Sequence, residues 1–84
     1  MLSFLRFIND SKYPVVTILD NDEPLATDLL QGQITSYRKV PSGTHEITVI
    51  HNQGKPFISG AVSLSGGDYF TLVIRNEDLT LINL

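Results

Sequence analysis

The stretch Gln33-Ile-Thr-Ser-Tyr-Arg-Lys-Val-Pro-Ser-Gly-Thr-His-Glu-Ile-Thr-Val-Ile50 decides the fold, because it places two alternating runs on either side of a turn. In the turn, Pro41 presets φ and Gly43 takes the position that other residues occupy poorly. In the run that follows, Ile47 and Val49 share one side of the chain, opposite polar neighbours. The stretch therefore predicts two strands, over residues 33–40 and 46–50.

Turns of this kind recur about every eleven residues, and runs of strand length lie between them. They are Asp10-Ser11, Asp20-Asn21-Asp22, Gln31-Gly32, Pro41-Ser42-Gly43, Asn52-Gln53-Gly54, Gly66-Gly67-Asp68 and Asn76-Glu77-Asp78. Such spacing is typical of a small antiparallel sandwich or barrel. We predict that Pro41, Gly43, Gly66 and Gly67 are structural turn residues.

The remaining runs extend the prediction over the whole chain. Further strands are expected over residues 2–8, 15–19, 56–64, 69–75 and 79–82. Glu23–Leu30 is less regular, and is expected to be a short edge strand or a crossover. We therefore predict an all-β protein, a single seven-stranded antiparallel immunoglobulin-like β-sandwich that spans residues 1–84 as one domain.

Composition excludes several classes of function. The chain has 84 residues and no Cys, so disulfides, thiolate zinc sites and cysteine nucleophiles are absent. Its net charge is −3, and only Arg38 and Lys39 are adjacent cations, so we expect no nucleic-acid partner. No apolar run is long enough for a membrane helix. The N-terminal run is interrupted by Arg6 and lacks a small-residue cleavage site, so we expect a strand and not a signal peptide.

Candidate catalytic and metal-binding residues are few. His45 and His51 share a strand face but lie about 20 Å apart at the strand rise, too far to share a metal. We expect both to be half-exposed residues at strand ends. The acidic run Asp20–Glu23 lacks the Gly and the distal Glu of a calcium loop and suits a hairpin turn. No Ser lies in a nucleophile elbow. We therefore predict no catalytic residue, no metal and no cofactor.

The first strand is apolar on both sides. Leu5 and Phe7 lie on one side, whereas Leu2, Phe4 and Ile8 lie on the other. A single sandwich buries one face of each sheet, so the second row has no place in the core. We predict that Leu2, Phe4 and Ile8 mediate self-association, with strand addition at an apolar edge as one route. The alternative is a bulge near Arg6 that rotates part of the strand inward.

Three segments resemble a known bacterial family. The run Ile34-Thr-Ser-Tyr-Arg-Lys-Val-Pro-Ser-Gly-Thr-His-Glu-Ile-Thr-Val49 resembles the V-S-x-Y-x-x-V-P-A-G-T-Y-x-V-x-V of the family known as domain of unknown function 4397. Arg6-Phe7-Ile8 with Ser11, Pro14 and Val16-Thr17-Ile18 is similar to its V-R-V-V-H-A-S-P-D-A-P-x-V-D-V-Y. Leu64–Val73 is similar to its L-x-A-G-x-x-Y-T-V-V. The resemblance covers roughly residues 5 to 75.

The resemblance implies a sandwich in a secreted or surface-exposed bacterial protein, often in tandem copies, with no common enzymatic activity. The chain departs from the pattern at polar positions. Asn9 stands at the family's His, Lys12 at its first Pro and Thr17 at its Asp, and one residue is missing before Pro14. A function that depends on that His and Asp in relatives is therefore expected to be lost here.

We accordingly predict a non-enzymatic structural or protein-interaction module of a bacterial surface or coat-type assembly. Its expected partner is itself or another surface protein. The alternative is a module that binds glycan or peptide through end loops. A glycan platform usually stacks sugars on exposed aromatic rings, yet the chain has no Trp, and Tyr37 and Tyr69 are expected at core or corner positions. Asn9-Asp10-Ser11 fits a glycosylation triplet, which matters only in a eukaryotic secretory route.

Overall fold

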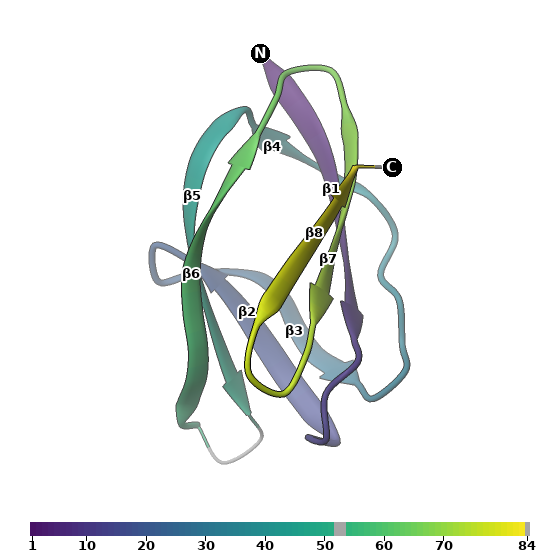
Figure 1. The fold of residues 1–84 in the computed structure, drawn as a ribbon, viewed down its shortest axis with the longest axis vertical. Helices are drawn as coiled ribbons and strands as arrows, with labels where there is room; N and C mark the ends of the chain where they lie inside the picture. Colours follow the sequence, from purple (N-terminus) through teal and green to yellow (C-terminus); the bar gives the residue numbers. More distant parts are fainter. Residues whose placement is uncertain (52–53, 84) are drawn as a thin grey trace.

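The computed structural model describes residues 1–51 and 54–83, and in them two four-stranded β-sheets lie face to face (Figure 1). The first sheet has the order β4-β1-β7-β8 and the second the order β3-β2-β5-β6. The strands are β1 (Leu2–Asn9), β2 (Val15–Asp20), β3 (Glu23–Leu30), β4 (Arg38–Pro41), β5 (Gly43–His51), β6 (Pro56–Leu64), β7 (Tyr69–Ile74) and β8 (Leu79–Asn83). None of the described residues is helical. The prediction of an all-β, sandwich-like fold is confirmed.

The prediction of seven antiparallel strands is wrong in two respects. The segment Glu23–Leu30, expected as a short edge strand or a crossover, is an edge strand of eight residues, β3, so the described residues contain eight strands. Its pairing with β2 is interrupted by register shifts, and Asp28 has a φ of 54°. Such a bulge breaks the alternation by which a strand is recognised in a sequence. In addition, β1 and β7 pair in parallel.

The position of β1 corrects the prediction of an apolar edge strand. β1 pairs with β4 on one side and with β7 on the other, so it lies inside the first sheet. Strand addition to β1 is therefore excluded, because its backbone groups already have partners. The alternative of a bulge near Arg6 is also wrong, since both registers run without a shift from Leu2 to Asn9.

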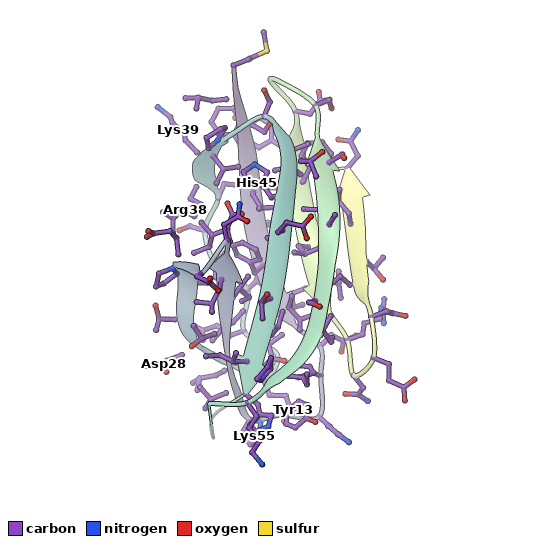
Figure 2. All side chains as sticks on the ribbon, turned by 90° about the vertical axis from the view of Figure 1, so that its left-hand side faces the viewer. Tyr13, Asp28, Arg38, Lys39, His45 and Lys55 are labelled. Atoms are coloured by element: carbon purple, nitrogen blue, oxygen red, sulfur yellow. The ribbon has the colours of Figure 1, made fainter. Side chains whose placement is uncertain are left out.

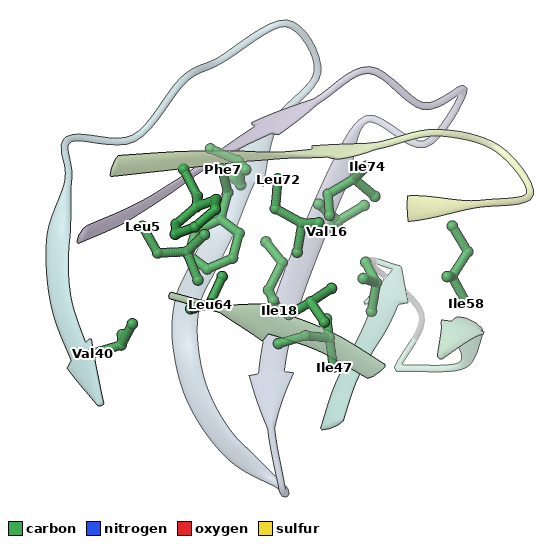
Figure 3. Close-up of a cluster of buried hydrophobic side chains, with 14 residues drawn as sticks. Leu5, Phe7, Val16, Ile18, Val40, Ile47, Ile58, Leu64, Leu72 and Ile74 are labelled. Carbon is green, nitrogen blue, oxygen red and sulfur yellow. The ribbon is translucent and has the colours of Figure 1, made fainter. Parts of the chain in front are cut away.

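The core lies between the two sheets, where side chains from both point toward each other (Figure 3). From β1, Leu5 and Phe7 are almost completely buried, and Ile18 and Ile47 meet them from the second sheet. Each such side chain contributes about 1.5–3 kcal/mol by leaving water. On β7, Phe70, Leu72 and Ile74 share one face, and all three belong to this core.

The predicted turn residues have different reasons for their identity. Gly43 has a φ of 112° and Gly67 a φ of 83°, which L-residues with a side chain rarely adopt. Gly66 has no such φ, and a Cβ there would only require the exposed, flexible side chain of Met1 to move. Pro41 is the last residue of β4. The predicted strand over 33–40 is shorter, since only 38–41 pair with β1 and Ile34 makes an isolated bridge to Ile8. The predicted turn residues Asn52 and Gln53 lie outside the described residues.

Candidate functional site

The outward side of the first sheet carries a cluster of large side chains. Strict alternation along β1 sends Leu2, Phe4 and Ile8, the predicted self-association residues, outward together with Arg6. In the parallel register, Tyr69 of β7 lies beside Phe4 and faces the same way. Tyr37, which precedes β4, contacts Arg6 and Tyr69. We call these six residues the aromatic face: Leu2, Phe4, Arg6, Ile8, Tyr37 and Tyr69.

Ring contacts hold the aromatic face together. The rings of Phe4 and Tyr69 stack with centroids 4.4 Å apart and an interplanar angle of 13°. Tyr37 meets Tyr69 edge-on, with centroids 5.0 Å apart. The guanidinium carbon of Arg6 lies 4.6 Å from the centroid of Tyr37, while its Nε donates a hydrogen bond of 2.9 Å to Thr71. Contacts of this kind are worth about 0.5–1.5 kcal/mol each, so the face is preformed.

This placement corrects the expectation for the tyrosines. Tyr69 is 47% exposed, and Tyr37 is half-buried, so neither belongs to the core. The alternation that buries Phe70 already sends Tyr69 outward, and this signal in the sequence could have located it. Nothing in the sequence pattern brings Tyr37 to Tyr69, because that contact depends on the strand order.

His45 is not half-exposed as predicted but buried, with 6% of its surface exposed. Its Nδ1 lies 2.6 Å from Oδ2 of Asp20, and its Nε2 lies 2.6 Å from the carbonyl oxygen of Pro41. Because both neighbours are acceptors, only the imidazolium can donate to both. His45 and Asp20 belong to the second sheet and Pro41 to the first, so this side chain ties the sheets together.

The protonation of His45 follows from this geometry. Burial lowers its pKa, but the hydrogen bonds to Asp20 and to the Pro41 carbonyl and the negative charge of Asp20 outweigh burial. The pKa of His45 is therefore raised above its ordinary value of 6.5. The charged form is the one that the fold stabilises.

His51 occupies a separate aromatic cluster toward the other end of the sandwich (Figure 2). Its ring stacks on Tyr13 with centroids 4.9 Å apart, and Tyr13 also packs on Phe57 at 4.3 Å. Tyr13 and Lys55 are labelled at that end in Figure 2, whereas His45 lies toward the opposite one. Within residues 1–51 and 54–83, no group of three His, Asp or Glu residues could hold a metal ion.

Two positions that depart from the family pattern hold β3 in place. Asn9 is fully buried, and its Nδ2 donates to the carbonyl oxygens of Tyr13 and Leu29, both at 3.1 Å. Thr17 accepts a hydrogen bond of 3.2 Å from the backbone N–H of Asp28, at the bulge. Both residues are therefore structural in this chain. Burial also makes the Asn9 amide inaccessible for glycosylation in the folded protein.

A cavity of about 270 Å³ lies beside β3. Phe7, Leu25 and Leu29 supply apolar walls, and Gln33 and Arg38 supply polar ones. Arg38 donates a hydrogen bond to the carbonyl oxygen of Leu25 and so links an edge strand of each sheet. The sequence analysis did not find this cavity, because its walls come from segments that only the topology brings together.

Comparisons with known proteins give one match. The pattern of the family described as "Domain of unknown function (DUF4397)" matches residues 3–83. Neither the curated proteins nor the solved structures give a significant match. In the part of the chain that the structure describes, no helix has the length and apolarity to cross a membrane. With nearly the whole chain matched, the protein belongs to the family of domain of unknown function 4397.

Proposed function

We propose that this chain is a non-enzymatic protein-interaction module that self-associates through the aromatic face. The observation that carries this proposal is an ordered cluster of aromatic and apolar side chains on an outward sheet surface. Leu2 and Tyr69 are each 47% exposed there, and Ile82 on β8 is 46% exposed. The setting, a bacterial surface or coat-type assembly, is supported by the family resemblance.

The composition of the aromatic face suits a protein partner. Tyr and Arg are enriched at the energetic centres of protein interfaces, because they offer large contact area with a polar tip. Arg6 is held by Tyr37 and Thr71 before any partner arrives, which lowers the entropy lost on binding. Leu2, Phe4 and Tyr69 are already partly buried, so burying the rest of each would contribute only a part of the about 1.5–3 kcal/mol of a side chain buried from full exposure, before association entropy.

The same geometry argues against glycan binding, one form of the alternative in which the module binds glycan or peptide through end loops. Sugars stack on the open face of an aromatic ring. Here Phe4 and Tyr69 cover one face of each other, and Arg6 covers a face of Tyr37. Tyr13, at the loop end, likewise packs against His51 and Phe57. In both clusters part of the ring surface is thus occupied within the molecule, which favours a protein surface as the partner.

Sedimentation velocity over a range of concentrations tests the proposal. The wild type should form species larger than the monomer, and Leu2→Asp should shift them to folded monomers. Leu30→Asp is the matched control, since Leu30 is another exposed leucine, at 55%, but ends β3 in the second sheet. The proposal fails if the wild type stays monomeric at high concentration, or if both substitutions act alike.

A further inference from the structure

Charge is segregated between the two sheets. The strands of the first sheet contain Arg6, Arg38 and Lys39 and no Asp or Glu. The strands of the second sheet contain Asp20, Glu23, Asp28 and Glu46 and no Lys or Arg. Among Lys, Arg, Asp and Glu, the strands of the first sheet thus carry only cations and the strands of the second sheet only anions.

Only some of these charges are free to meet a partner. Arg38 is used within the molecule by the carbonyl of Leu25, and Asp20 by His45. Lys39 projects outward beside Phe4, its partner in the register. Arg6 projects outward two residues further along β1, where Tyr37 and Thr71 hold its side chain. Glu46 projects outward from β5, and it is exposed. The outward charges thus keep the same separation by sheet.

The outward surfaces of the two sheets also differ in the size of their side chains. On β5 and β6, the outward residues around Glu46 are small: Thr44, Thr48, Ser59, Ala61 and Ser63. Thr44 and Ser63 share a hydrogen bond of 3.2 Å across the strands. We call these five residues and Glu46 the small-residue face. Apart from Glu46 its side chains are short, whereas the aromatic face carries three rings.

We propose that self-association is head-to-tail, with the aromatic face of one copy seated on the small-residue face of the next. This inference rests on the proposed function. Two aromatic faces packed together would bring Arg6 and Lys39 of both copies close with no carboxylate in either sheet to neutralise them. The head-to-tail arrangement sets Arg6 and Lys39 against Glu46 instead, and such complementarity selects the partner surface.

This arrangement has a geometric consequence. A contact between two different faces leaves one free face of each kind at the ends of every assembly. Growth therefore continues unless a rotation closes a ring, and an open stack results. Neither a closed dimer nor a fixed stoichiometry is expected.

The test uses two variants that each block one face. Tyr69→Asp puts a charge on the aromatic face, and Glu46→Arg reverses the charge of the small-residue face. Neither variant alone should stack, but an equimolar mixture should form dimers and nothing larger, because each partner still offers one intact face. Glu77→Arg makes the same charge change in the exposed β7–β8 loop and should stack as the wild type does. Sedimentation velocity measures the sizes, and circular dichroism checks that each variant is folded.

Other outcomes separate this inference from the proposed function. If the Tyr69→Asp variant is monomeric but the Glu46→Arg variant associates as the wild type does, the aromatic faces pair with each other. The head-to-tail inference is then overturned, while the proposed function stands. If Glu46→Arg and Glu77→Arg weaken association equally, net charge is responsible, and the inference again fails. A monomeric wild type overturns both proposals. If Tyr69→Asp does not fold, Lys39→Glu replaces it, with the same expected results.

Discussion

Strand β1 carries two rows of apolar side chains that look alike in the sequence but have different surroundings in the structure. Leu5 and Phe7 face the core and are almost completely buried. Leu2, Phe4 and Ile8 face outward and remain partly exposed, held by ring contacts on their own surface. The inner row has a second sheet opposite it, and the outer row has none. Apolar character alone therefore does not distinguish a core row from an outward-facing row.

The largest expected difference between the rows is the cost of truncation. Leu5→Ala should lower the free energy of unfolding by about 2–5 kcal/mol, because it leaves a cavity in a packed core. Leu2→Ala, on the outer row, should change it by about 0.5 kcal/mol or less in the monomer. Urea denaturation of both variants at low concentration measures this. Similar costs for the two leucines would refute the assignment of the rows.

The inner row ends in a polar residue, and its removal should be the next largest effect. Asn9→Ala leaves the carbonyls of Tyr13 and Leu29 without their donor and Ser11 without its acceptor. Buried groups without partners cost about 1–3 kcal/mol each, so a loss of about 3 kcal/mol is expected. Thermal denaturation measures it. A melting temperature within a degree of the wild type would show that water or neighbouring groups replace the amide.

The hydrogen bonds of His45 to Asp20 and to the Pro41 carbonyl should make the free energy of unfolding depend on pH. The pKa of His45 in the folded protein is raised above 6.5, so its contribution is complete below about pH 6.5 and is lost as pH rises through the folded pKa. We expect a contribution of about 2 kcal/mol, from charged hydrogen bonds that are largely buried. Unfolding free energies from pH 6 to 9 should fall in the wild type relative to His45→Gln. Parallel curves for the two proteins would contradict a charged His45.

The smallest expected effect lies in the outer row. Phe4→Ala removes the stacked partner of Tyr69 and should cost the monomer about 1 kcal/mol. Its effect on association should be larger, since it also removes part of the aromatic face. Comparing denaturation at low concentration with sedimentation at high concentration separates the two. If the Phe4→Ala variant is unfolded, the outer row also contributes substantially to the stability of the fold.

The alternation of residues along a strand predicts which way each side chain points, but not which strands pair. It correctly sends Leu5 inward and Phe4 outward, because side-chain direction along a strand is local. The same alternation groups His45 with Ile47, so its burial was within reach of the sequence. The sequence did not identify the hydrogen-bond acceptors of His45, because Asp20 and Pro41 belong to other strands.

The features that alternation misses are set by topology. The parallel pairing of β1 with β7 puts Tyr69 beside Phe4, across more than sixty residues of chain. The bulge at Asp28 interrupts the alternation of β3, which makes the strand hard to recognise in the sequence. The residue that accepts the hydrogen bond from the bulge is Thr17 of the neighbouring strand. The candidate site is assembled from such long-range contacts, so the sequence identified its central strand with Phe4, but not the contributions of Tyr37, Tyr69 and Arg6.

The most direct test of the central claim, that the outer row of β1 is an interface, is hydroxyl-radical footprinting of the wild type at increasing concentration. The account predicts that Leu2, Phe4 and Tyr69 become protected as concentration rises, while Leu30 stays as reactive as in the monomer. Unchanged reactivity of Leu2, Phe4 and Tyr69 at the highest concentration would contradict it.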